Sequence, residues 1–202
     1  MTECAGLWRR TLLIDTDGSR NDTADVRWLQ GITAFVDLRR PRPLLDLSEQ
    51  DGFAGWLSQS GDVFTWDRFA GIQPQDTPDE GRMHWDGDVL VEDGVHSDYA
   101  EHWVRDPAPA EPSWALGLST ADGDAALLLR VGGLFGWAER VGSDVEIALG
   151  TVTDSAWLIT DSSLPHRAGT SLAPRRDGGE LKVAGAVGNR WQITESEGSV
   201  TL

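Results

Sequence analysis

Short segments in which apolar and polar residues alternate make up most of this chain, and turns rich in glycine, proline and aspartate separate them. In residues 62–69, for example, Phe64, Trp66 and Arg68 fall on one face of an expected strand, because successive side chains of a strand point to opposite sides. Roughly a dozen such segments follow one another closely, with no convincing amphipathic helix longer than two turns. This pattern is typical of an all-β, antiparallel barrel or sandwich and argues against a parallel α/β sheet.

The alternation also indicates where individual strands begin and end. The ranges expected to be strands are 8–14, 26–30, 32–39, 62–69, 82–85, 89–92, 99–105, 114–119, 125–131, 134–141, 145–149, 156–160, 181–186 and 190–195. The pair Asp86 and Gly87 predicts a tight hairpin, since glycine accepts the positive φ that such a turn requires. Residues 44–60 favour a short helix or a loop, and residues 71–81 have the composition of an exposed loop.

A proline-rich break at residues 107–112 divides the chain into two parts. We expect residues 1–106 to form an N-terminal β-barrel half and residues 113–202 to form a C-terminal β-rich half. With 202 residues, the chain is long enough for one large barrel or for two small ones packed together, and the sequence leaves both arrangements open.

Charge excludes several classes of partner. The chain has 33 acidic and 17 basic residues and a formal net charge of -16, whereas nucleic acids and anionic membranes attract clusters of Lys and Arg. No segment approaches the roughly 18 to 20 apolar residues of a membrane span, and residues 1–10 lack the apolar run of a signal peptide, which favours a cytoplasmic protein. Cys4 is the one cysteine, so an intrachain disulfide is excluded. No cofactor-binding motif is present.

Ten tryptophans are the most unusual feature of the composition. Those within expected strands are Trp8, Trp28, Trp66, Trp85, Trp103, Trp137, Trp157 and Trp191. Because an indole buries a large apolar area, most of them are expected in the core. So many indoles nevertheless exceed what packing in a small β-structure usually requires. We therefore expect two or three of Trp28, Trp66, Trp85 and Trp103 to line a ligand cavity.

The densest group of polar and aromatic residues lies in residues 92–105. A strand at 99–105 would place Tyr99, Glu101, Trp103 and Arg105 on one face and His102 on the other. Such a face suits a ligand-bearing barrel, with Glu101 as a general acid or base and Tyr99 as a hydrogen-bond donor. The alternative is a solvated face with a Glu101–Arg105 ion pair. Residues four apart in a strand are about 13 Å apart, so each would require another partner.

Other candidate groups carry weaker signals. His84 and His102 could assist proton transfer, but together with His96 they lack the spacing of a metal site, and none is predicted. Asp37 and Arg39 share a strand face and suit an ion pair at a barrel rim.

The chain also resembles a known group of barrels. Gly6-Leu7-Trp8 is similar to the Gly-x-Trp start of lipocalins and other calycins, and Arg190-Trp191 is similar to the arginine that packs on that tryptophan. Residues 7–10, 26–30, 36–39, 51–55, 92–94 and 99–103 resemble the HRI1-like calycin group of poorly characterised bacterial proteins. The resemblance covers about half of the chain, mostly residues 7–105. It implies a lipocalin-like barrel followed by a second β-rich half, and it assigns no catalytic residue. Unlike secreted lipocalins, this chain shows neither a signal peptide nor a disulfide.

Three functions fit these observations. The first is binding of an apolar or aromatic small molecule in a Trp-lined cavity, with its polar end held by Arg27, Arg68, Glu101 or Arg105. The second is a cofactor-independent cyclase, isomerase or dehydratase that uses Tyr99, Glu101 and a histidine in the same cavity. The third is an interaction module whose acidic surface selects a basic partner. The sequence decides neither between enzyme and binder nor whether the chain forms a homodimer.

Overall fold

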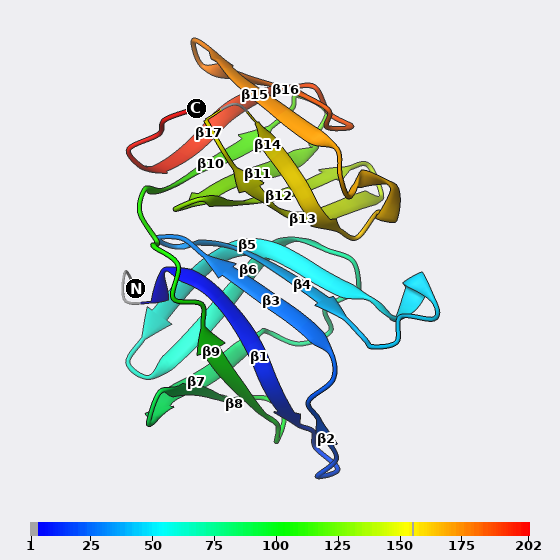
Figure 1. Cartoon of the computed structure of the whole chain (residues 1–202), viewed down its shortest axis with the longest axis vertical. Coiled ribbons are helices and arrows are strands. Elements are labelled where there is room, and N and C mark those ends of the chain that lie inside the picture. The colour runs from blue at the N-terminus through cyan, green and yellow to red at the C-terminus, as the bar shows by residue number, and fades with distance from the viewer. Residues whose placement is uncertain (1–3, 155) are drawn as a thin grey trace.

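The structure, a computed structural model, describes residues 4–154 and 156–202 and contains two antiparallel β-barrels, one from each half of the chain (Figure 1). The strands of the N-terminal barrel are β1 (Gly6–Ile14), β2 (Arg20–Asn21), β3 (Asp25–Gln30), β4 (Ala34–Arg40), β5 (Asp51–Ser60), β6 (Val63–Gly71), β7 (Glu80–Asp86), β8 (Val89–Gly94) and β9 (Ala100–Arg105). Strands β3 to β9 follow sequence order around the barrel, and β1 pairs with both β3 and β9, which closes it. The all-β prediction is confirmed, and the halves form two barrels.

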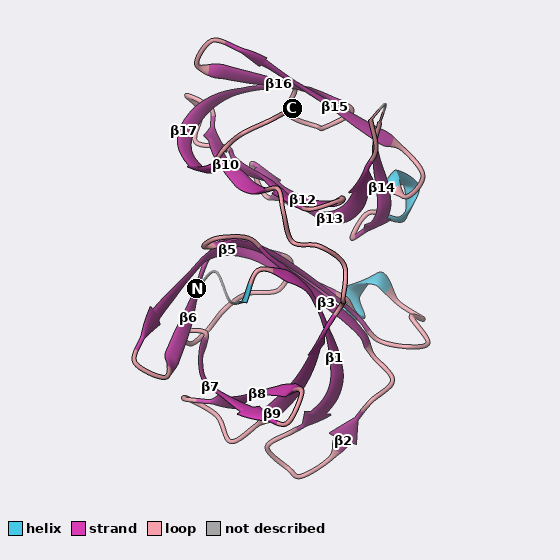
Figure 2. Ribbon diagram, turned by 60° about the vertical axis from the view of Figure 1, so that its left-hand side comes forward, coloured by secondary structure: helices cyan, strands magenta, loops and turns pink. Residues whose placement is uncertain are grey.

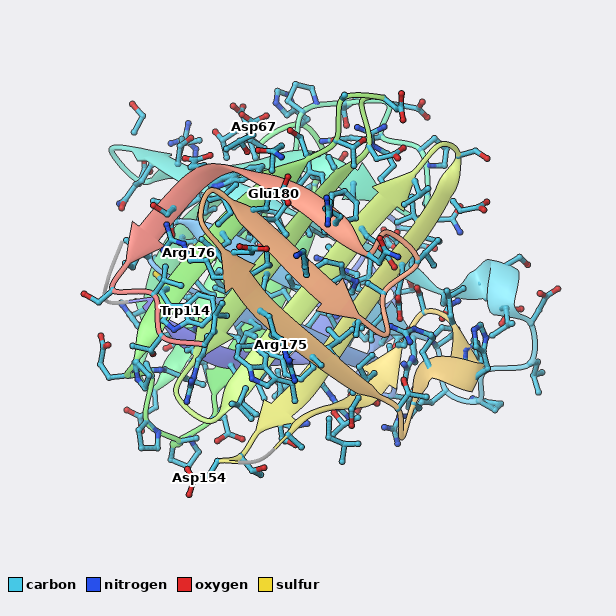
Figure 3. All side chains as sticks on the ribbon, turned by 90° about the horizontal axis from the view of Figure 1, so that it is seen from above. Asp67, Trp114, Asp154, Arg175, Arg176 and Glu180 are labelled. Atoms are coloured by element: carbon cyan, nitrogen blue, oxygen red, sulfur yellow. The ribbon has the colours of Figure 1, made fainter. Side chains whose placement is uncertain are left out.

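The C-terminal barrel is also a closed meander, in which β10 pairs with β17. Its strands are β10 (Ser113–Ser119), β11 (Ala125–Val131), β12 (Leu134–Val141), β13 (Asp144–Val152), β14 (Trp157–Ser162), β15 (Ser171–Asp177), β16 (Glu180–Ala184) and β17 (Arg190–Gly198). The 3₁₀ turns η2 (Leu47–Glu49) and η3 (Pro165–Arg167) lie in loops between strands. Figure 3 looks onto this barrel, where the β15–β16 hairpin carries the exposed Arg175 and Arg176. None of the helices in residues 4–154 and 156–202 is long and apolar enough to cross a membrane.

Alternation along the strands fills the N-terminal barrel, which Figure 2 shows almost end-on. Trp8 and Trp28 are cross-strand partners whose ring centroids lie 5.7 Å apart, and Trp103 contacts Trp28 at the same distance. Trp66 contacts Trp28 from another strand, with centroids 5.9 Å apart. These rings are buried against one another, so the middle of the barrel is a packed aromatic core.

The outer faces of strands from the two barrels form a shared apolar interface. Val36 and Leu38 of β4 pack there with Leu127 and Leu129 of β11. Gly136 of β12 allows the close approach, because a Cβ atom at this position would lie 2.6 Å from Cγ2 of Val36. Both faces of the contributing strands are therefore buried, one inside its barrel and one against the other barrel.

This double burial explains one of the two long strands that are missing from the expected secondary structure. The other, β15, was missed because Pro174 lies within it, and proline disfavours a strand. Residues 44–60 were expected to form a helix or a loop, but residues 51–60 form strand β5. Phe53 faces the interior of the barrel, whereas Ala54 packs in the interface with the second barrel. A strand buried on both faces has no polar side to alternate with, so periodicity alone does not identify it.

Candidate functional site

The N-terminal barrel buries a group of charged side chains at the end where β6 leads to β7 and β8 leads to β9. In β4, Asp37 and Arg39 follow Phe35 at intervals of two, so all three side chains face the interior. The same alternation brings in Arg10 from β1, Arg68 from β6, Glu92 from β8 and Glu101 from β9. Asp37, Glu92 and Glu101 are at most 4% exposed. Because isolated buried charges are strongly unfavourable, these groups require partners inside the barrel.

Two guanidinium groups, those of Arg10 and Arg39, pair with Glu101 at the centre of this network. Oε1 of Glu101 accepts hydrogen bonds from Nη1 of Arg10 and, at 3.1 Å, from Nη1 of Arg39. Arg39 also donates from Nε to Oδ1 of Asp37 at 2.9 Å. The second oxygen of Glu101, Oε2, is buried and has no hydrogen-bond partner among the described residues. Glu101 is therefore paired on one oxygen only.

Glu92 lies opposite Glu101 in the β8–β9 ladder, but its hydrogen-bond partners are neutral. The hydroxyl of Tyr99 donates to Oε1 of Glu92 at 3.1 Å, and Nε1 of Trp103 donates to Oε2 at 3.2 Å. Burial, with the nearby charge of Glu101, raises the pKa of Glu92 from 4.5 to about 8. This carboxyl is consequently protonated at neutral pH.

The pKa values of Asp37 and Tyr99, in the same region, are also shifted. Burial raises the pKa of Asp37 from 3.8 to about 6, although the guanidinium of Arg39 opposes the shift. Burial and the charge of Glu92 raise the pKa of the Tyr99 hydroxyl well above its usual value. Tyr99 is therefore a neutral hydrogen-bonding group at every physiological pH.

A pocket of about 300 Å³ lies beside this network, at the end of the barrel. Its lining residues are Arg68, Pro74, Gln75, Asp76, Thr77, Pro78, Asp79, Glu80, His96, Ser97 and Tyr99. Arg68 donates from Nε to Asp79 at 3.0 Å, and Nε2 of His96 lies 2.9 Å from Glu80. Since Tyr99 lines the pocket and also contacts Glu92, it connects the pocket to the buried carboxyls.

A second pocket, of about 420 Å³, is formed partly by the turns at the opposite end of the same barrel. Phe64, Met83, Trp85 and Leu90 supply most of its apolar lining. Trp85 is 59% exposed, and its ring centroid lies 6.0 Å from that of Trp8. Gln59 and Asp62 also line this pocket, so its lining is mixed, and none of the buried carboxyls Asp37, Glu92 and Glu101 lies beside it.

The structure brings together part of the predicted site. Tyr99, Glu101 and Trp103 share one face of the chain as expected, and Arg68 lies with them. Trp28 and Trp66 belong to the packed aromatic core. The alternative of a solvated Glu101–Arg105 pair was wrong, because Glu101 is buried and pairs with other arginines.

The remaining candidate residues lie away from this pocket, which corrects their assignment to the site. On β9, His102 faces away from Glu101, as alternation predicted, and the His84 side chain is 56% exposed beside Asp93. Arg27 points out of the barrel and pairs with Asp161 of the second barrel at 2.7 Å. Alternation within one strand does not indicate a contact between segments so distant in sequence.

Arg105 lies near the other end of the barrel from Glu101. It is the cross-strand partner of Trp8, and its guanidinium lies against Gly6, where an added Cβ would be 2.5 Å from Nε. The arginine beside the Gly6–Trp8 segment is therefore Arg105, whereas Arg190 belongs to the second barrel and its pairing with Trp8 was wrong.

Sequence reasoning missed Glu92 and Arg10. Glu92 follows Leu90 by two residues in an expected strand, so alternation alone could have placed it inside the barrel. Arg10 likewise follows the inward-facing Trp8 by two residues in β1. Both were overlooked because a charged residue at an inward position is rare.

The second barrel contains another buried pair of carboxylates, Glu139 and Glu146, which are cross-strand partners. They line a pocket of about 350 Å³ that also touches Ile72 of the first barrel. Glu139 accepts hydrogen bonds from the backbone N–H groups of Val187 and Gly188, and Glu146 accepts from Arg167. Their oxygens are thus used to hold neighbouring loops, which is a structural role.

Comparisons with known proteins support the fold only. No family model matches the chain, and no curated protein matches it. A crystal structure described as an uncharacterized protein YLR301w from Saccharomyces cerevisiae is similar, with a TM-score of 0.66 over 95% of this chain and 98% of that one. At 12% identity this likeness shows a shared fold and carries no residue roles. Within the described residues, no three His, Cys, Asp or Glu side chains are arranged to hold a metal ion.

Proposed function

We propose that the N-terminal barrel binds a small molecule in the pocket lined by Arg68, Asp79 and Tyr99. The observation that carries this proposal is the position of Tyr99, which lines the pocket and donates a hydrogen bond to Glu92, a buried carboxyl whose pKa burial raises to about 8. Titratable groups with strongly shifted pKa values are concentrated at functional sites, so a carboxyl of this kind beside a pocket supports a binding role. A concave site with a few convergent polar groups is the usual form of a small-molecule site.

The polarity of the pocket lining restricts the chemical class of the ligand. The pocket walls are mostly polar and charged, and the tryptophans behind them pack on one another. A ligand with several hydrogen-bonding groups therefore suits this site better than the apolar metabolite expected from the tryptophan content. The closed barrel and the contact of Arg105 with Gly6 near Trp8 also support a calycin-like relationship, which we include in the proposal.

A second candidate function is acid–base catalysis in the same pocket. Glu92 carries a proton at neutral pH and is connected to the pocket by a single hydroxyl, that of Tyr99. A general acid is most effective when its pKa lies near the working pH, and this carboxyl meets that condition. Cofactor-independent isomerisation or dehydration of a polar metabolite would use this arrangement.

Native mass spectrometry of the gently purified chain tests the binding proposal. We expect an adduct of small-molecule mass that is lost on denaturation. Thr77→Trp places a large ring in the rim of the pocket and should remove the adduct, whereas Ala121→Trp, in an exposed turn of the second barrel, should keep it. An adduct that survives Thr77→Trp would contradict the assignment of the pocket, as would a chain that carries no adduct and binds none of a panel of polar metabolites.

A further inference from the structure

The buried network of the N-terminal barrel contains one more carboxyl than it has guanidinium groups. Its charged residues are Arg10, Arg39 and Arg68 on the positive side and Asp37, Asp79, Glu92 and Glu101 on the negative side. An uncompensated charge is strongly unfavourable in such a place, so one carboxyl should hold a proton. The contacts identify this carboxyl as Glu92. Glu101 pairs with two arginines, whereas within residues 4–154 and 156–202 the hydrogen-bond partners of Glu92 are Tyr99 and Trp103.

The position of Glu92 also accounts for the unpaired oxygen of Glu101. The two residues are directly opposite on β8 and β9 and face the same interior, so their Cβ atoms should lie about 5 Å apart. Oε2 of Glu101 is buried and meets no N–H or hydroxyl donor of the described residues. A protonated Glu92 is a donor of the right kind on the facing strand. One proton can thus be held between the two carboxyls.

The pocket itself favours positive charge. Asp76, Asp79 and Glu80 line it, against Arg68 and His96. The one guanidinium is bound to Asp79, and the imidazole is bound to Glu80. The hydroxyl hydrogen of Tyr99 is used on Glu92, which leaves its oxygen to accept a hydrogen bond from a ligand. An ammonium or guanidinium group matches both the charge and the free acceptor.

We propose that the ligand of this pocket is an organic cation, and that its binding releases the proton held between Glu92 and Glu101. The proposal rests on the proposed binding function of the same pocket. In the exchange, the O–H bond of the Glu92 carboxyl breaks and the proton passes to solvent. The ligand's positive charge, on the pocket side of Tyr99, then compensates the new carboxylate. No other bond changes and no electron is transferred.

The direction of the coupling follows from linkage. A cation near Tyr99 stabilises the ionised form of Glu92, so the ligand should bind more tightly as pH rises, up to about tenfold per pH unit below the pKa of this carboxyl. The other charged or titratable groups facing Glu92 are Tyr99 and Glu101 from the β9 side, Asp37 and Arg39 from β4, Arg10 from β1, and Arg68 with Asp79 from the β6 side. The pKa of Asp37 is about 6, so its titration falls at lower pH.

Titration calorimetry with agmatine and putrescine tests this proposal, with succinate as the anionic counterpart. Each titration is run in phosphate and in HEPES, neither of which is a net cation, because the difference in binding heat between buffers counts the protons released. For the unaltered chain we expect the amines to bind with release of nearly one proton near pH 7, and succinate not to bind. Glu92→Gln keeps an acceptor for Tyr99 and a donor for Glu101, and it should bind the amines with no proton release. Asp93→Asn, on the outer face of β8, should behave like the unaltered chain.

Each of the other outcomes contradicts a different part of the proposal. Binding of succinate in place of the amines contradicts the cationic ligand but leaves the pocket as a binding site. Amine binding with equal heats in both buffers removes the coupling to Glu92. If no probe binds, the adduct seen by native mass spectrometry distinguishes the two proposals. A neutral or anionic adduct contradicts the cationic ligand alone, and the absence of any adduct contradicts the binding function as well. Infrared spectra without added ligand should show a protonated-carboxyl band at neutral pH that Glu92→Gln removes, and a spectrum without this band contradicts the shared proton.

Discussion

Glu92 and Glu101 face each other across neighbouring strands inside the N-terminal barrel, yet only Glu101 is paired with arginine. This difference separates the two carboxyls chemically. Glu101 has a charge-assisted hydrogen bond from each of two guanidinium groups, whereas Glu92 is surrounded by a phenol, an indole and the negative charge of its partner. The position of the arginines therefore decides which carboxyl holds a proton at neutral pH.

The first prediction concerns the pH dependence of stability. The pKa of Glu92 in the folded chain, about 8, lies above its ordinary value of 4.5. Between these values the folded chain holds a proton that the unfolded chain has released, so the free energy of unfolding falls with rising pH, by at most about 1.4 kcal/mol per pH unit. This contribution is fully present below about 4.5 and is lost by about 8. Asp37 adds a decline of the same sign between 3.8 and about 6.

Urea unfolding of the unaltered chain and of Glu92→Gln measures this effect. Above pH 6 the decline comes mainly from Glu92, because Asp37 has already titrated. The variant should therefore lose most of the dependence between pH 6 and 8 and become the more stable of the two at the upper end. A stability difference that does not change with pH would contradict the raised pKa.

The second prediction concerns the arginine partners of Glu101. Glu101→Gln removes the negative charge that Arg10 and Arg39 share inside the barrel. Because Arg10 and Arg39 lose the carboxylate with which they pair, and the remaining carboxyl, Glu92, is hydrogen-bonded to Tyr99 and Trp103, we expect a loss of about 3–5 kcal/mol in the free energy of unfolding. Glu195→Gln, at an exposed position of β17, is the matched control and should change it by less than about 0.5 kcal/mol. Equal effects of the two substitutions would show that the network does not stabilise the fold.

The third prediction separates Arg27 from ligand binding. Arg27 pairs with Asp161 of the second barrel, and its side chain is about one quarter exposed. Arg27→Ala should lower stability by about 1 kcal/mol, since partly exposed pairs contribute little. A double-mutant cycle with Asp161→Ala should show a coupling of similar size. If Arg27→Ala instead abolished the native adduct without a change in stability, its assignment to the barrel interface would be wrong.

The fourth prediction concerns the contact between the barrels. Gly136→Ala brings a methyl group against Val36, and the overpacking should cost about 1–3 kcal/mol. The double variant with Val36→Ala should recover part of this loss because it makes room for the methyl group. Thermal unfolding of the single and double variants measures the recovery. Additive losses would indicate that the two residues do not contact each other.

Sequence alternation predicted the all-β class and the shared facing of Tyr99, Glu101 and Trp103, since period two depends only on the backbone. It failed for strand β5, whose two faces are both buried. It also did not identify the partners of Glu101, because Arg10 and Arg39 come from strands distant in sequence and meet it only when the barrel closes. Arg27 was misplaced for a related reason, as its partner belongs to the other barrel.

The most direct test of the account is a crystal structure of the chain purified gently without added ligand. The account predicts an additional small molecule in the pocket at the β6–β7 and β8–β9 end of the N-terminal barrel, in contact with Tyr99. A molecule seated instead beside Trp85 at the opposite end, or beside Glu139 in the second barrel, would contradict it.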